Sequence, residues 1–289
     1  MNHITSPNEP YPSPETLAAA TTTHTQTRFR ISTRKLPISK SSAIDDLEKR
    51  LGIPVPEMIF GDNLVSVTHT PTNWTLAFNT ADALDTVDKT DKNMLRVAYA
   101  RDWESTREET TQNIKEVVKP YDWSYSTTYA GTVENATTTT TTTKEEGLDF
   151  RPTEKQIPIE LLKRRDPILF FDEVVLYESE LDDNGISVYS AKLRVHEKRM
   201  LLLCRLFMRL DSVLVRIRDT RVYIDFETDE VLREYTAKEA SFADVTRALF
   251  LSGRHPDDIT VALREPNILD PLLKVVEQRV EAISLPVQI

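Results

Sequence analysis

The chain has 289 residues, with 36 Lys and Arg against 46 Asp and Glu, so its formal net charge is −10. Hydrophobic residues make up 39% and charged residues 28%, which is typical of a folded domain. The acidic balance argues against a protein that binds nucleic acid or an anionic membrane through bulk charge. Only 6 glycines occur, and none of them forms a glycine-rich phosphate-binding motif.

The single cysteine, Cys204, excludes an intramolecular disulfide and fits a reducing compartment. No apolar stretch approaches the ~20 residues that a membrane-spanning helix requires, and the N-terminal region holds no signal-peptide core. We therefore expect a cytoplasmic protein that binds neither membrane nor nucleic acid, with nuclear entry left open.

The domain organisation follows from two biased segments. Residues 1–27 are rich in Pro, Thr and Ser, and they are predicted to form a disordered N-terminal extension. Residues 28–289 are predicted to form one domain. A run of threonines inside 134–147 has no apolar face and predicts a flexible loop within that domain.

In the first half of the domain, a helix is predicted from Ser42 to Gly52. Asp45 lies three residues after Ser42, as in a capping box, and the glycine is a typical stop. Further on, the pattern predicts a hairpin, a strand and a short helix: 64–69 with 74–78, 94–99, and 102–109.

The second half is dominated by apolar and β-branched runs that predict an antiparallel meander: 168–178, 186–196, 200–210 and 213–226. Asp183-Asn184-Gly185 predicts a tight type I′ turn between the first two. Helices are predicted over 238–252 and 270–284, the second with Asp270 as N-cap. The fold class is therefore α+β, with predominantly antiparallel sheets flanked by several helices in a single domain.

No motif for catalysis, metal binding or a cofactor stands out. None of the five histidines has a second His or Cys at ligand spacing, and Cys204 lies in the most apolar run. Carboxylates are abundant, but acid pairs arise by chance at this composition. We therefore expect a protein that is not an enzyme and has no cofactor.

Charge is segregated along the meander. Residues 172–183 carry six acids and no base, whereas 192–221 carry nine bases and three acids. Arginines alternating along strands line one sheet face, where they are able to bind carboxylates in a bidentate way. Pairing between the acidic and basic strands is an equally good explanation.

Six short motifs occur in a specific order: PEMIFGDN, FNTADAL, KPYDWSYST, YESEL, RDTR and LREY, which begin at residues 56, 78, 119, 177, 218 and 232. Together they resemble the TIPRL family, TOR-signalling regulators that bind type 2A serine/threonine phosphatases. The likeness runs from about residue 29 to residue 236. The Thr tract and the long N-terminal extension depart from the family pattern.

The resemblance implies a non-catalytic regulator that binds catalytic subunits of type 2A-like phosphatases. It also implies links to the Tap-type (alpha4-like) phosphatase-associated protein and to TOR-dependent nutrient signalling. The implied fold has antiparallel sheets and a cleft that accepts the C-terminal tail of the phosphatase. A multi-partner scaffold without such a cleft is the main alternative, and an unrecognised carboxylate-dependent hydrolase is a weaker one.

Five residues are candidates for binding this partner: Asp82, Ile157, Ile217, Asp219 and Arg221. Each has a structural alternative. Asp82 is also placed to cap a helix. Asp219 and Arg221 are equally compatible with an internal salt bridge. A core position is favoured for Ile217, and Ile157 is either an exposed anchor or the start of a strand.

The hypothesis is that Asp82, Ile157, Ile217 and Asp219 border a cleft for an extended peptide. Neighbouring arginines would pair with its acidic groups and terminal carboxylate. On this view, changing Asp219 to Leu weakens binding without unfolding the domain.

Overall fold

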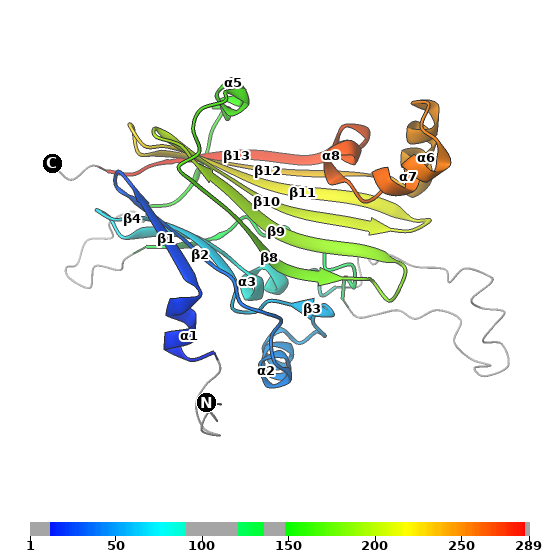
Figure 1. The fold of residues 1–289 in the computed structure, drawn as a ribbon, viewed down its shortest axis with the longest axis horizontal. Coiled ribbons are helices and arrows are strands. Elements are labelled where there is room, and N and C mark those ends of the chain that lie inside the picture. The colour runs from blue at the N-terminus through cyan, green and yellow to red at the C-terminus, as the bar shows by residue number, and fades with distance from the viewer. Residues whose placement is uncertain (1–11, 91–120, 136–147, 287–289) are drawn as a thin grey trace.

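The computed structural model describes residues 12–90, 121–135 and 148–286. They form two antiparallel sheets stacked on a shared core, with helices at the ends and edges (Figure 1). This confirms the predicted single α+β domain.

The small sheet has the strand order β1-β2-β4-β5-β6. Its strands are Thr21–Gln26, Phe29–Arg34, Leu64–His69, Trp74–Asn79 and Thr132–Glu134. The β4–β5 hairpin lies where the alternating pattern predicts it. Helices α1 (Pro14–Ala19), α2 (Ser41–Leu51) and α3 (Thr80–Asp85) belong to the same half of the chain.

The large sheet has the order β3-β8-β9-β10-β11-β12-β13-β7. Its long strands are Phe170–Ser179, Gly185–Val195, Arg199–Leu210, Leu214–Asp225, Glu230–Ser241 and Lys274–Ser284, and its short ones are β3 (Met58–Ile59) and β7 (Arg151–Pro152). The first four long strands, β8 to β11, are the predicted meander. Helix α5 (Ile159–Lys163) precedes β8, while α6 (Phe242–Leu251), α7 (Pro256–Ala262), α8 (Pro266–Leu269) and a 3-10 turn (Asp270–Leu272) lie between β12 and β13.

The core lies between the two sheets because side chains alternate along the strands. On β9, Leu193 and Val195 are buried, whereas Lys192 and Arg194 are exposed on the opposite face. The buried face packs with residues of the small sheet such as Trp74, which is fully buried. We call the opposite face of the large sheet, turned away from this core, the outer face.

The predicted helix over 270–284 is wrong. Residues 274–284 form β13, which pairs with β12 from Glu230↔Ser284 to Glu239↔Lys274. The apolar positions 276, 280 and 283 suit a helix by their spacing, but β-branched residues beside an unpaired strand edge favour the sheet. The helix predicted over 238–252 begins only at Phe242, because 230–241 continue the meander as β12.

The N-terminal extension is also partly ordered. Within the predicted disordered segment 1–27, residues 14–19 form α1 and 21–26 form β1, whereas 1–11 lie outside the described residues. Ser13 caps α1 by accepting a hydrogen bond from the backbone N–H of Thr16, and the threonines of β1 pair along β2. Backbone pairing at a sheet edge orders this polar segment without a large apolar face.

Two local predictions need correction, and others are not tested. Helix α2 begins at Ser41 after Lys40, and no side chain caps it, so the capping box at Ser42 is absent, although Gly52 ends the helix in the left-handed region (φ 73°). The turn before β9 is longer than type I′, because the Gly185 N–H donates to the Glu180 carbonyl at 3.3 Å. The elements predicted over 94–99 and 102–109, and most of the Thr-rich loop 134–147, lie outside the described residues.

A buried charge cluster joins the two sheets. Asp229, in the β11–β12 turn, is fully buried; its Oδ2 accepts a hydrogen bond from Arg28 Nε at 2.6 Å and lies 3.8 Å from His69 Nε2. The His69 Nδ1 is hydrogen-bonded to the Thr72 hydroxyl at 2.8 Å. Burial lowers the pKa of His69, which outweighs the opposing effect of Asp229, and Arg28 lowers it further.

This cluster makes a pH dependence of stability the expected result. Because the pKa of His69 is lower in the folded than in the unfolded protein, the unfolded state binds more protons below about pH 6.5. The free energy of unfolding should therefore fall as the pH falls from 6.5 through the lowered pKa. Urea unfolding of the wild type and of His69→Gln across this pH range measures the change in the free energy of unfolding. If this free energy fell equally with pH in both proteins, groups other than His69 would be the cause.

Candidate binding groove

The outer face of the large sheet carries side chains in rows that cross the strands. Near the end covered by α5, Phe171, Arg194, Leu201, Tyr223 and Leu232 stand opposite one another on β8 to β12, and we call this set the first row. The next two rows are charged: Glu173, Lys192, Leu203, Arg221 and Glu234, then Ser190, Arg205, Asp219 and Thr236. The following row, at the other end, is mostly apolar again: Val188, Phe207, Ile217 and Lys238.

One end of this face is covered by the segment 157–166, which we call the strap and which includes α5. Its residue Ile157 is 3% exposed and packs with Tyr223 and Leu232 of the first row. The guanidinium of Arg199 holds the strap, since Nη2 donates to the Leu161 carbonyl at 3.0 Å and also pairs with Asp166. The strap therefore covers the β11–β12 half of the first row.

The other end is covered by the C-terminal helices. Ile217, Val215 and Phe207 form a second core cluster with Val245 of α6 and Leu269 of α8. Figure 1 shows α5 and α6 to α8 over opposite ends of the long strands. The two charged rows lie between these covers.

The centre of the charged rows is a tightly paired carboxylate. Asp219 is 2% exposed. Its carboxylate accepts hydrogen bonds from Nε and Nη2 of Arg205, both at 2.7 Å, and from Nη2 of Arg221 at 3.1 Å. Arg221 also donates to Glu234 at 2.8 Å. Across the neighbouring strands, Lys192 pairs with Glu173 at 2.8 Å. Pairing between acidic and basic strands, one of the two explanations for the charge segregation, therefore occurs here.

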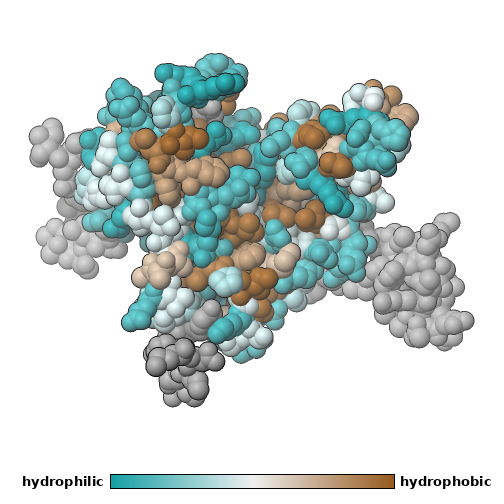
Figure 2. Space-filling model, viewed as in Figure 1, coloured by the Kyte–Doolittle hydropathy of each residue, from teal (hydrophilic) through white to brown (hydrophobic). Residues whose placement is uncertain are grey.

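Two adjoining cavities make this face a groove. The smaller, of about 530 Å³, is lined by Phe171, Arg194 and Leu201 of the first row and by Ile157 of the strap, among others. The larger, of about 870 Å³, runs over the charged rows to the loop before α8, and it shares Lys192, Arg194 and Leu203 with the smaller one. Figure 2 shows apolar and hydrophilic surface side by side over the long strands.

The structure brings together only some of the residues expected at the cleft. Ile157 and Arg221 line the smaller cavity, and Asp219 lies in the next row, where it accepts a hydrogen bond from Arg221. Ile217 shares the outer face, but it is 1% exposed under the C-terminal helices, as its favoured core position predicts. Ile157 is neither an exposed anchor nor part of a strand.

Asp82 is placed elsewhere. It lies in the first turn of α3, where Asn79 caps the helix by accepting a hydrogen bond from the Asp82 N–H at 2.9 Å. The Asp82 carboxylate accepts hydrogen bonds from Asn79 Nδ2 at 2.8 Å and from the Thr132 hydroxyl at 2.5 Å. It lines neither cavity of the groove. The structure therefore places Asp82 as an acidic residue at the N-terminus of α3, which is the structural alternative for this residue, while the cap itself is Asn79.

Other residues of the groove carried no signal in the sequence by themselves. Phe171 and Ile168 are 54% and 50% exposed and line the smaller cavity beside Arg194. Alternation along 186–196 places Arg194 on the same face as Lys192, but it does not reveal which residues of β8 and β10 lie next to it. That information lies in the register between strands.

The single cysteine, Cys204, lies buried in β10. Burial raises the pKa of the Cys204 thiol to about 12, so this cysteine is a poor nucleophile. Within the described ranges there is no group of three or more His, Cys, Asp or Glu side chains arranged to hold a metal ion. Likewise, no helix in this part of the chain has the length and apolar character to cross a membrane.

Fold and groove thus define a class: a two-sheet α+β protein whose candidate site is an elongated surface groove with apolar and charged parts. A model of the TIP41-like family matches residues 58–246. The chain belongs to the TIP41-like family, which confirms the resemblance drawn from the six motifs.

Three relatives show how far the similarity extends. The TIP41-like protein of Homo sapiens is 36% identical over 262 residues, which cover 90% of this chain and 89% of the relative. The type 2A phosphatase activator TIP41 of Saccharomyces cerevisiae is 35% identical over 271 residues, or 89% and 73% of the two chains. The type 2A phosphatase activator tip41 of Schizosaccharomyces pombe is 31% identical over 252 residues, or 87% and 94%.

Proposed function

We propose that this protein is a non-catalytic regulator that binds the catalytic subunit of type 2A-like serine/threonine phosphatases. The names of the two yeast relatives describe activators of type 2A phosphatases, and family membership extends a role linked to these enzymes to this chain. The observation that carries the proposal is the groove between the strap and the C-terminal helices, whose two adjoining cavities of about 530 and 870 Å³ give room for an extended peptide.

The peptide we assign to the groove is the C-terminal tail of the catalytic subunit. An extended tail across the outer face places its side chains over the first row and its acidic groups over the charged rows. The buried Asp219 holds Arg205 and Arg221 in fixed positions, so the basic side of the groove is preorganised. Asp219 is thus a positioning residue, and Arg221 and Ile157 form part of the wall.

The cellular setting of this role is part of the proposal. We place the protein in the cytoplasm, with the nucleus as a second location, and in TOR-dependent nutrient signalling. A Tap-type (alpha4-like) phosphatase-associated protein is the second proposed partner. Co-precipitation from cells, with and without the tail of the catalytic subunit, separates a direct link to this protein from one through the phosphatase.

Calorimetric binding to a purified type 2A catalytic subunit, intact or lacking its C-terminal tail, tests the proposal. Binding to the intact subunit with at least a tenfold loss for the truncated one, about 1.4 kcal/mol, is the expected result. Equal affinity for both forms would move the interface away from the groove. No binding to either form would contradict the function.

A further inference from the structure

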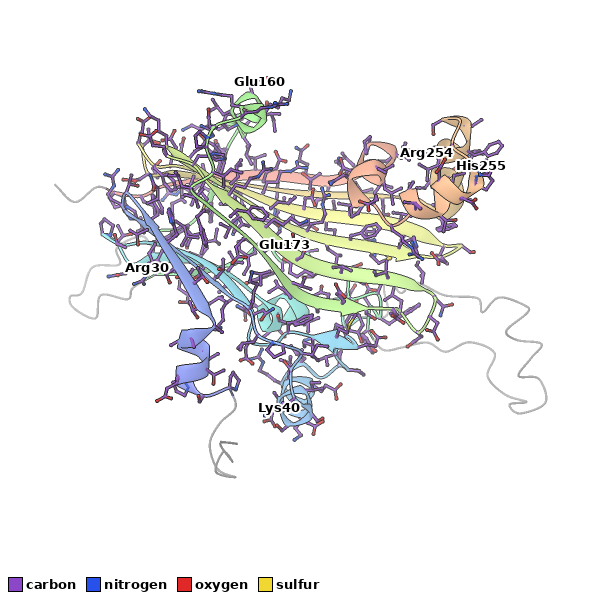
Figure 3. The ribbon with its side chains drawn as sticks, in the orientation of Figure 1. Arg30, Lys40, Glu160, Glu173, Arg254 and His255 are labelled. Atoms are coloured by element: carbon purple, nitrogen blue, oxygen red, sulfur yellow. The ribbon has the colours of Figure 1, made fainter. Side chains whose placement is uncertain are left out.

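The most exposed apolar side chains of the described residues lie in α6 and α7. Leu251 is 77% exposed, Phe250 63% and Val261 62%, and no other large apolar side chain in the described ranges reaches these values. We call these three residues the apolar tip. Figure 2 shows hydrophobic surface at the outermost part of α6 and α7, and Figure 3 places Arg254 and His255 there. An exposed apolar patch of this kind marks an interaction surface.

The apolar tip takes no part in the core. Val245 and Leu249 of α6 are buried in the second core cluster with Ile217 of β11. From α7, Ile259 and Ala262 enter the same cluster. A surface helix needs one apolar side for folding, whereas α6 carries further apolar residues at its C-terminal end, outside this cluster. The core therefore does not explain the apolar tip, but a partner that covers it does.

The apolar tip adjoins the groove. Arg264 follows α7 directly; its backbone N–H donates to the Val261 carbonyl at 3.0 Å, and the residue lines the larger cavity. The strap, at the other end of the groove, exposes charged side chains such as Glu160, Lys163 and Arg164. Figure 2 shows this contrast between the two ends. A protein with its tail in the groove thus meets the more apolar surface at the α6–α7 end.

Charge and size decide which kind of partner fits. Exposed charges of both signs lie near the tip, among them Arg254, Asp257 and Asp258, whereas an anionic membrane or a nucleic acid requires a surplus of basic residues. Three side chains are also too few for the roughly 800 Å² per partner that a stable dimer buries. Such a patch is effective as a second contact, because a first contact elsewhere raises its effective concentration to about the millimolar range.

We propose, on the basis of the function proposed above, that the apolar tip is a second docking site for the folded body of the phosphatase catalytic subunit. Leu251 and Phe250 enter an apolar hollow on that body, which sits at the α6–α7 end and not over the strap. The tip alone binds the body weakly. Together with the tail in the groove it gives an affinity that neither contact reaches by itself.

Calorimetry with three ligands tests this arrangement: the intact catalytic subunit, the subunit without its C-terminal tail, and a synthetic tail peptide. The wild type should bind the tail-less subunit weakly but measurably. Leu251→Gln should abolish this binding and weaken binding of the intact subunit by about tenfold, because one large apolar side chain is no longer buried. Its affinity for the tail peptide should stay within about twofold of the wild type, because distant sites act independently.

The matched control is Ile38→Gln. Ile38 is 48% exposed, has the size of a leucine, and lies between β2 and α2 in the half of the chain that forms the small sheet. The control should bind all three ligands like the wild type. An equal loss in Ile38→Gln and Leu251→Gln would show that exposed apolar residues attract the subunit without a defined site, and this would overturn the proposal.

Failure of the docking site and failure of the proposed function look different. If Leu251→Gln bound the intact subunit as tightly as the wild type, the tip would be excluded and the function of the groove would stand. If neither the intact subunit nor the tail peptide bound the wild type, the proposed function would be rejected and the docking site with it. A wild type that sediments as a dimer, with Leu251→Gln as a monomer, would assign the tip to a second copy of the chain instead.

Discussion

Replacing Ser190 by tryptophan should lower the affinity for the phosphatase catalytic subunit by about tenfold or more, or about 1.4 kcal/mol. Ser190 lies on β9 opposite Arg205 and lines the larger cavity of the groove. Its side chain is on the outer face, away from the core, so an indole there fills the path of an extended peptide without displacing buried residues. Calorimetry with the purified proteins measures the change.

The control is Thr25→Trp. Thr25 is an exposed residue of β1, an edge strand of the small sheet. The substitution also replaces a small polar side chain by an indole. Thermal unfolding should show nearly equal midpoints for both variants and the wild type. If Ser190→Trp bound as tightly as the control, the peptide would have to lie elsewhere.

The meander was predictable from sequence because its strands are buried on one face and carry long apolar or alternating runs. Strand β13 was not, since Val276, Val280 and Ile283 recur at a spacing that suits a helix as well as a strand. Only pairing with the edge of β12 decides between the two, and β12 is distant from this segment in the sequence. The same reason explains β1, whose polar threonines are ordered by pairing with β2.

The candidate site was predictable in part. The alternation of the RDTR motif places Asp219 and Arg221 on one face, and the structure adds that Arg205 and Glu234 are their cross-strand neighbours. No local pattern reveals that neighbour relation, which also sets Phe171 beside Arg194. The position of Asp82 relative to the groove was not predictable for a similar reason: a motif fixes its place in α3 but not the distance from α3 to the outer face.

Changing Asp219 to Leu should destabilise the domain, contrary to the expectation from sequence that it affects binding alone. Asp219 is 2% exposed, and it accepts two hydrogen bonds from Arg205, whose side chain is 14% exposed. Removing the carboxylate leaves a nearly buried guanidinium without its main partner, which costs about 3 kcal/mol. Urea unfolding followed by tryptophan fluorescence measures the loss.

The double variant Arg205→Met with Asp219→Leu shows whether the orphaned charge is the cause. Replacing both members of a buried ion pair by apolar residues is close to neutral, so most of the lost stability should return. Binding should stay weak in the double variant, because the basic wall of the groove has lost Arg205 and the support of Arg221. A double variant as unstable as Asp219→Leu would show that the carboxylate stabilises the sheet through something other than this pair. If binding recovered together with stability, Asp219 would act on the partner only by keeping the domain folded.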